Sequence, residues 1–233
     1  MANDLDSTVH IDFADEVLRT TRSVRLRLDL ERSVPRSLIE TAIEVAIQAP
    51  NRGNSQTWRF GVVTDQRKRA SLAELYRAGA KTLHGRRYRS HESSSARCAR
   101  LCRRRFTPPT NAQVIKSAVH LIDNLHRVPV HIIPFLEGRF ETEDVFTQGS
   151  KWGSILPAAW SLMLALRVRR VASAWTTFTL MYEAEIRELL GVPDTYAQAV
   201  LLPVAWLTGG NLYPARRLPV CEVTYWDSWD ARR

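Results

Sequence analysis

The sequence has few cysteines, no long hydrophobic run and no basic targeting peptide at its start. Its three cysteines among 233 residues are an odd number, which argues against a disulfide framework and favours a reducing compartment. The most apolar run, 155–166, is shorter than the roughly 20 residues that span a bilayer, and Pro157 and Ser161 interrupt it. The first fifteen residues contain four aspartates and no lysine or arginine, the opposite of a signal or transit peptide. We therefore expect a cytoplasmic protein with no membrane partner.

Acidic residues are nearly missing from one central segment, 84–106. It contains eight arginines and one glutamate, a local charge of +7 out of a net +9 for the chain. Three interpretations remain open: a nucleic-acid contact, a solvated insertion, or a basic lid that attracts an anionic cofactor or substrate. The segment offers only Tyr88 and Phe106 for stacking on bases, which disfavours the first interpretation. We expect no nucleic-acid partner.

Hydrophobic periodicity predicts helices that alternate with strands in one layered α/β domain over 15–229, after a flexible leader at 1–14. The basic segment falls in a variable insertion at about 84–110. The apolar helix at 153–169 is expected to be fully buried, and Cys221 is expected in the core, in a β-like stretch at 221–226. The expected helices span 15–22, 35–49, 66–79, 114–126, 153–169 and 183–190, and the expected strands span 58–64, 128–136, 171–177 and 198–208.

Two arginines bracket a serine near the start of the domain. Arg22 and Arg25 are three residues apart, a spacing that places them on one face of a helix. Two guanidinium groups with the hydroxyl of Ser23 between them would form a receptor for a phosphate dianion. The alternative is ordinary surface charge in a basic protein.

Two further polar clusters lie downstream. The loop 50–56 is rich in turn-forming residues, and its Gly53 permits close approach of the backbone to a planar ligand. The pair Arg216 and Arg217 follows the last expected core strand. Each cluster on its own is equally consistent with a simple surface loop.

Taken in order, these segments strongly resemble the motifs of the nitroreductase family. The resemblance covers roughly 15–229 and is interrupted mainly at 84–110. Six motifs in the right order carry it, at 21–25, 49–58, 153–158, 172–177, 185–193 and 217–219. Among members of this family, the motif sequences are most similar to those of actinobacteria.

The resemblance implies an α+β fold in which a mostly antiparallel sheet is wrapped by helices, with FMN bound at the interface of an intertwined homodimer. By position, Arg22, Ser23 and Arg25 would hold the phosphate and ribityl chain, and Arg217 would join them at the phosphate. NADPH or NADH would be the electron donor, and a nitroaromatic, a quinone or a similar electron-poor small molecule would be the acceptor.

The same resemblance assigns residues to the flavin ring. Asn54 and Gln56 would form hydrogen bonds with the ribityl chain or with the pyrimidine edge of the isoalloxazine. Since hydride passes directly to the flavin and water can supply protons, no catalytic side chain is expected. The ring would be flanked by Ala174 and Trp175 from the other subunit, and by Pro157 and Ala158.

Several positions depart from the family's pattern. Asn51 stands where a serine is frequent, Thr57 stands where proline is frequent, and 170–172 replaces glycines. None of these departures removes an expected phosphate ligand, so FMN binding is a firmer expectation than the substrate. The basic insertion would favour an anionic substrate or the additional phosphate of NADPH.

Other functions remain open. The protein could be an FMN-dependent dehydrogenase or oxidase of a biosynthetic pathway, or a flavin-sequestering or sensor protein without catalysis. A zinc site at Cys98 and Cys102 with nearby histidines is disfavoured by their spacing of four, so no metal is expected. His120, His126 and His131 are expected to be structural.

Overall fold

A computed structural model describes residues 3–90 and 111–229 of the chain. For 3–9, 84–90, 111 and 112 the helical backbone alone is described. Most of the basic insertion therefore lies outside the described residues, including Cys98 and Cys102.

The centre of the molecule is an antiparallel sheet with the strand order β1-β2-β5-β3, in which β4 also pairs with β2. Every strand pair is antiparallel. The sheet is thus the antiparallel one that the family resemblance implied, rather than the parallel sheet typical of alternating helices and strands. The strands are β1 (Trp58–Val63), β2 (Val130–Glu137), β3 (Val171–Ser173), β4 (Tyr196–Gln198) and β5 (Leu202–Trp206).

The single strand expected at 198–208 is two strands separated by a bulge. Phe135 pairs with Gln198 and Ile132 pairs with Leu202, so two residues of β2 face three residues of the partner segment. Inside this bulge, Leu201 turns to the other neighbour, where its N–H donates to the carbonyl of Thr176 at 2.9 Å. The strand expected at 171–177 is shortened to β3, with an isolated bridge at Thr176.

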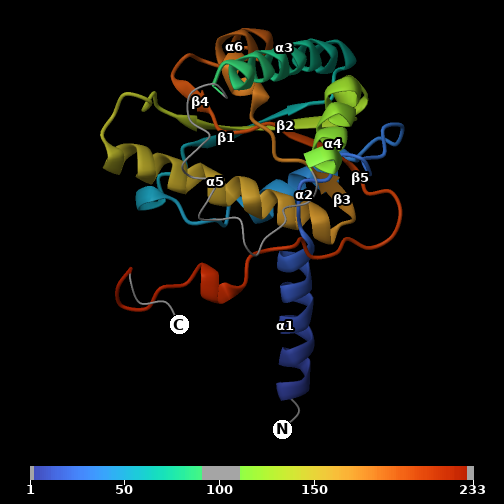
Figure 1. The fold of residues 1–233 in the computed structure, drawn as a ribbon, viewed down its shortest axis with the longest axis vertical. Coiled ribbons are helices and arrows are strands. Elements are labelled where there is room, and N and C mark those ends of the chain that lie inside the picture. Colours follow the sequence, from blue (N-terminus) through green and yellow to red (C-terminus); the bar gives the residue numbers. More distant parts are fainter. Residues whose placement is uncertain (1–2, 91–110, 230–233) are drawn as a thin grey trace.

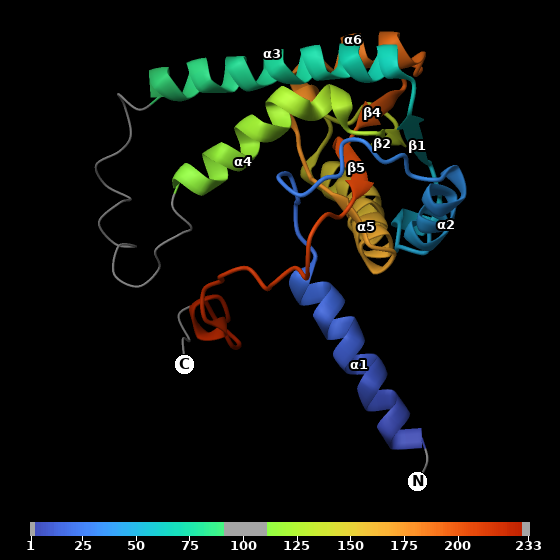
Figure 2. The same cartoon turned by 90° about the vertical axis from the view of Figure 1, so that its right-hand side faces the viewer.

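Helices cover both faces of the sheet (Figure 2). On β2, Ile132 and Leu136 pack with α2 and α5, whereas Ile133 and Phe135 pack with α3, α4 and α6. This alternation with a period of two produces two cores, one on each face. The helices are α1 (Asn3–Thr20), α2 (Arg36–Ala46), α3 (Gln66–Ser90), α4 (Asn111–Asn124), α5 (Val145–Val168) and α6 (Glu183–Leu190), with short 3-10 turns η1 (Arg52–Asn54), η3 (Leu125–Arg127), η4 (Phe178–Tyr182) and η5 (Val220–Glu222).

The helix α1 and the chain after Tyr213 extend away from the body, on the side of α5 opposite the sheet (Figures 1 and 2). Both carry exposed apolar side chains, for example Ile11 at 62% and Val220 at 76%. The helix α5 is also not fully buried as expected, because Trp160 is 36% exposed on it. One side of α5 therefore presents apolar surface to solvent.

The C-terminal tail differs most from expectation. Cys221 is exposed and lies in the turn η5, not in a buried strand. The stretch 221–226 forms no strand, because an apolar alternation pairs only where a neighbouring strand edge is available. Of the described helices, none is long and apolar enough to cross a membrane.

Several boundaries also differ. The helix expected at 15–22 is the last part of α1, which begins at Asn3, and the flexibility expected of 1–14 stays a prediction. By contrast α6 ends where expected, since Gly191 adopts a left-handed conformation with φ of 69°.

Candidate functional site

Arg22, Ser23 and Arg25 lie in an extended segment that follows α1. Because α1 ends at Thr20, the two arginines do not share a helical face as their spacing suggested. The segment is tied to the end of β3 instead. The N–H of Val24 donates to the carbonyl of Ser173 at 2.9 Å.

The hydroxyl of Ser23 links this segment to the tryptophan motif. Its Oγ accepts a hydrogen bond from the backbone N–H of Trp175 at 2.8 Å. Ser23 and Trp175 therefore meet within one chain, whereas the resemblance assigned them to different subunits. The proton of the Ser23 hydroxyl is still free to donate to a ligand.

The two arginines have different surroundings. Arg22 is exposed, and its Nη1 donates to the carbonyl of Tyr213 at 2.9 Å. Arg25 is half-buried and lies near Tyr76, whose hydroxyl is 2.9 Å from Oγ1 of Thr176. Burial raises the pKa of Tyr76, and the hydrogen bond with Thr176 and the charge of Arg25 oppose that shift. Among the described residues, no carboxylate forms an ion pair with Arg22 or Arg25.

The loop 50–57 presents Asn54 and Gln56 to solvent. Gln56 adopts a left-handed backbone with φ of 50°, and its N–H donates to Oδ1 of Asn51 at 3.0 Å. Its side-chain amide donates to Oδ1 of Asn54 at 3.3 Å. The loop rests on α5, where Oγ of Ser154 accepts from the N–H of Arg52 at 3.0 Å. Asn51, which departs from the family pattern, therefore shapes the loop.

A single chain does not bring the two clusters together. Ser173 pairs with Val204, which pairs with Val130, whereas Trp58 pairs with Leu136 at the other end of β2. Six residues along a strand and three strands across separate Ser173 from Trp58 by about 20 Å or more, at about 3.3 Å per residue and about 4.8 Å per strand. Asn54 and Gln56 are therefore far from Ser23.

The residues expected beside the ring are partly inaccessible in one chain. Ala158 and Ala174 have no exposed surface, so neither side chain lines a surface cavity of the described chain. Pro157 and Trp175 are half-buried, and Pro157 lies inside α5. Their contact with a flavin stays a prediction.

Arg217 lies in the tail, four residues beyond Tyr213. Its Nη1 donates to the carbonyl of Arg216 at 3.2 Å. Four residues of extended chain reach about 14 Å, so Arg217 is within reach of Arg22 without contacting it in this conformation.

Sequence reasoning missed Arg27, which anchors the start of the tail. Its guanidinium donates to the carbonyls of Thr208 at 2.7 Å, of Asn211 at 3.2 Å, and of Gly210. The sequence could have indicated this, because Arg25 and Arg27 alternate with apolar residues. Such alternation is typical of an extended segment rather than a helix.

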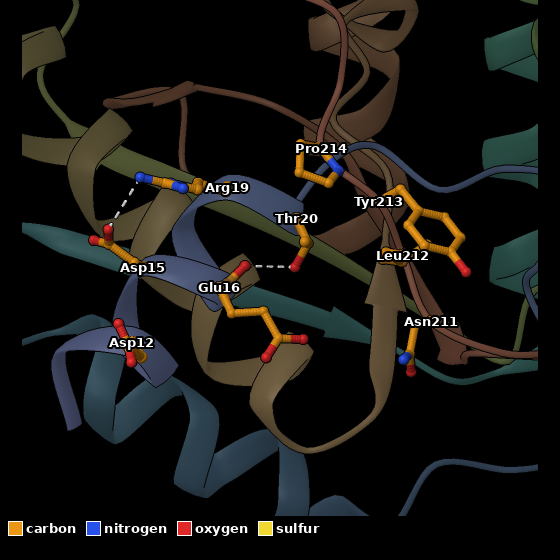
Figure 3. Close-up of a pocket in the computed structure, with 9 residues that line it drawn as sticks. All are labelled: Asp12, Asp15, Glu16, Arg19, Thr20, Asn211, Leu212, Tyr213 and Pro214. Carbon is orange, nitrogen blue, oxygen red and sulfur yellow. Dashed lines mark hydrogen bonds and ion pairs between the residues drawn. The ribbon is translucent and has the colours of Figure 1, made fainter. Parts of the chain in front are cut away.

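A cleft of about 440 Å³ lies between α1 and residues 211–214 (Figure 3). Three carboxylates line it, from Asp12, Asp15 and Glu16, and its Arg19 is paired with Asp15 at 3.3 Å. This excess of negative charge repels a phosphate dianion. The cleft is therefore not the phosphate site, although Tyr213 on its wall accepts from Arg22.

The histidines show no catalytic arrangement in the described residues. His131 is fully buried: its Nε2 is 3.0 Å from the carbonyl of Leu125, and its Nδ1 has no hydrogen-bond partner among the described residues. Burial lowers the pKa of His131 to about 4, so its ring is neutral at pH 7. In the part of the chain that the structure describes, no three His, Cys, Asp or Glu side chains could hold a metal ion.

Comparison with known proteins identifies the motifs and the fold. The model of the nitroreductase family matches residues 18–206. No curated protein sequence matches the chain.

Three solved structures illustrate the likeness. The FMN and NADPH-dependent nitroreductase NfnB from sphigopyxis sp. strain HMH is 22% identical, with a TM-score of 0.63 over 93% of this chain and 99% of that one. A BluB-like flavoprotein from Clostridium difficile 630 is 15% identical, with a TM-score of 0.65 over 92% and 99%. An oxidized iodotyrosine deiodinase bound to FMN and 3-iodo-L-tyrosine is 20% identical, with a TM-score of 0.61 over 88% and 96%. At these identities the likeness shows a shared fold.

Proposed function

The chain belongs to the nitroreductase family, and from that premise we propose that it is an FMN-dependent oxidoreductase. It transfers hydride from NADPH or NADH to an electron-poor small molecule such as a nitroaromatic or a quinone. The similar structures named above support FMN as the cofactor, since the iodotyrosine deiodinase is bound to FMN and NfnB is an FMN and NADPH-dependent nitroreductase. Bound FMN would supply the redox chemistry, and the protein would supply binding, orientation and electrostatics.

The arginine cluster fits the phosphate of this cofactor. Arg22 and Arg25 bring two positive charges that no described carboxylate neutralises, and Ser23 between them keeps a hydroxyl proton to donate. Guanidinium groups donate in a planar fork that suits phosphate oxygens. Arg217 would join them if the tail packs against a second copy of the chain.

A second copy of the chain completes the site. Asn54 and Gln56 are exposed on the loop that leads into β1, whose Trp58 lies about 20 Å or more from Ser173 in the same chain. In the proposed homodimer, this loop of one copy meets the cluster of Arg22, Ser23 and Trp175 of the other. The exposed apolar side chains of α1, α5 and the tail support such an interface.

The protein contributes no acid or base to the chemical step. The amides of Asn54 and Gln56 would hold the flavin and donate hydrogen bonds to its pyrimidine edge. Donors at that position stabilise negative charge on the reduced ring. The backbone at Ala174 and Trp175, held by Ser23, would limit the space beside the ring.

A visible spectrum of the purified protein tests the proposal. We expect flavin absorption bands close to one equivalent per chain, and bleaching of these bands on anaerobic addition of NADPH or NADH. A colourless protein that cannot be reconstituted with FMN would overturn the cofactor assignment.

The same titration separates the other functions. Flavin that is inert to nicotinamides but is bleached by an organic substrate indicates a dehydrogenase or oxidase. Flavin that neither reagent reduces indicates a sequestering or sensor protein.

A further inference from the structure

A small cationic pocket lies behind the loop that carries Asn54 and Gln56. Its volume is about 300 Å³, and it opens between the loop and the first half of α5. Both of its charged residues are basic, and none of the described residues that line it is acidic. Its polar lining consists of Arg52, Ser55 and Thr57 from the loop and Lys151 and Ser154 from α5.

The ammonium group of Lys151 is held at the wall of this pocket. Its Nζ donates to the carbonyl of Glu137 at 3.0 Å. Gly138, with φ of 107°, leaves room for it, since a Cβ there would lie 3.3 Å from Nζ. An ammonium has three donors, so two remain for a ligand.

Arg52 lines the pocket from the loop. Its backbone N–H donates to Ser154, and its guanidinium lies 5.1 Å from the centre of the Phe146 ring, within the range of a cation–π contact. Arg52 and Lys151 thus approach the pocket from two elements that a hydrogen bond joins.

The charge of this pair is not neutralised within the described residues. Neither Arg52 nor Lys151 forms an ion pair there. Of the nearby acids, Glu141 pairs with Arg139, and the carboxylate of Asp144 accepts from Thr147 at the start of α5. Two unneutralised cations that line one pocket together with hydroxyl groups favour an oxyanion.

We propose that this pocket binds a carboxylate or phosphate group of one of the two reactants, so that the protein selects an anionic reactant. The inference rests on the proposed function, because the pocket residues Ser55 and Thr57 flank Gln56, which is assigned there to the flavin. An oxyanion in the pocket directs the rest of the molecule past the loop towards the ring. The volume suits one charged group with a short stem, not a whole dinucleotide.

Two acceptors of nearly the same shape, one anionic and one neutral, test the pocket. If the acceptor carries the oxyanion, kcat/KM of the wild-type protein for 4-nitrobenzoate should exceed that for neutral 4-nitrobenzamide. In that case Lys151→Met and Arg52→Met should each lower kcat/KM for 4-nitrobenzoate about tenfold or more, the effect of one charge-assisted hydrogen bond. They should leave 4-nitrobenzamide nearly unchanged. Lys116→Met, an exposed lysine on α4, is the matched control and should change neither.

Comparison of NADPH with NADH identifies the reactant that carries the oxyanion. A loss confined to NADPH assigns the pocket to its 2′-phosphate, and a loss confined to 4-nitrobenzoate assigns it to the acceptor; either result supports the pocket. If Lys151→Met and Arg52→Met lower kcat/KM equally for 4-nitrobenzoate, 4-nitrobenzamide, NADPH and NADH, or lower it for none of them, the pocket proposal is overturned.

Calorimetric titration of the purified protein with 4-nitrobenzoate, NADPH and NADH provides a readout independent of turnover. Binding of one anionic compound that Lys151→Met abolishes supports the pocket even in a protein that reduces nothing, so the proposed function can fail alone. A protein that reduces nitroaromatics but shows no charge preference and no Lys151-dependent binding keeps the proposed function and overturns the pocket.

Discussion

At the scale of single residues, Arg22 carries the proposed phosphate contact. Arg22→Ala should weaken FMN binding by about 1.5–3 kcal/mol, the contribution of a hydrogen bond to a charged group. The measurement is the dissociation constant of FMN by fluorescence titration of the apoprotein. Arg67→Ala, an exposed arginine on α3, should leave the constant unchanged. Unchanged flavin affinity in Arg22→Ala would mean that the phosphate lies elsewhere.

His131 makes the stability of the fold depend on pH. Burial lowers its pKa from 6.5 to about 4 in the folded protein. Between these two values the unfolded chain binds a proton that the folded chain does not, so the free energy of unfolding falls as the pH falls. At pH values well above 6.5 both states are neutral and His131 adds no pH dependence.

The change that isolates this contribution is His131→Gln, whose amide can still donate to the carbonyl of Leu125. Wild type should lose about 3 kcal/mol more than the variant between pH 6.5 and 4, because each pKa unit corresponds to about 1.4 kcal/mol. Urea unfolding at several pH values measures the two slopes. If the free energy of unfolding depends on pH in the same way in wild type and in His131→Gln, the prediction is contradicted.

Sequence reasoning could identify the types of residue at the site but not their geometry. The arginines and the loop 50–56 are visible as motifs. That α1 ends at Thr20 and leaves Arg22 in an extended segment depends on the pairing of Val24 with Ser173, 149 positions away in sequence. Likewise, nothing local indicates that Lys151 and Arg52 line one pocket, because Lys151 is held by Glu137 of β2 and Arg52 by Ser154 of α5.

At the scale of helices and strands, the boundaries that could be predicted are those set by residues close to them in sequence. Gly191 ended α6 because a left-handed residue satisfies the last carbonyls of a helix. The start of α5 was missed although Asp144 caps it through the N–H of Thr147 at 3.0 Å, since no apolar periodicity follows until 153. The break between β4 and β5 was not predictable, because a bulge is defined by the register of the partner strand.

Gly79 allows α3 to approach η4 closely. A Cβ at this position would lie 2.3 Å from the carbonyl oxygen of Phe178, a backbone atom that cannot rotate away. Gly79→Ala should therefore destabilise the protein by about 1–3 kcal/mol, although alanine favours helices. Thermal unfolding of the variant measures the change.

Gly149 in α5 is the matched control, because a Cβ there would meet nothing within 4 Å. Gly149→Ala should stabilise the fold by about 0.5–1 kcal/mol through helix propensity alone. Opposite signs for the two substitutions identify packing, not helix propensity, as the reason for Gly79. Two stabilising substitutions would show that α3 can move away from η4.

At the scale of the whole molecule, the two proposed halves of the flavin site lie at different ends of the sheet. The loop 50–57 rests on the first half of α5, whereas the cluster of Arg22, Ser23 and Trp175 follows its end through β3. If two copies pack along α5 in opposite directions, the loop 50–57 of one copy meets the cluster of Arg22, Ser23 and Trp175 of the other. Such a twofold contact would generate two equivalent sites.

This arrangement predicts that dimerisation and flavin binding are lost together. Trp160 is 36% exposed on α5, on a helix whose opposite side forms one core of the chain. Trp160→Glu should convert a dimer into a folded monomer, because an unpaired charge in a closed apolar interface costs several kcal/mol. Sedimentation and circular dichroism measure mass and fold, and flavin retained after gel filtration measures the cofactor. Arg67→Glu should remain a flavin-loaded dimer. A folded monomer that still holds one FMN per chain would show that one copy contains the whole site.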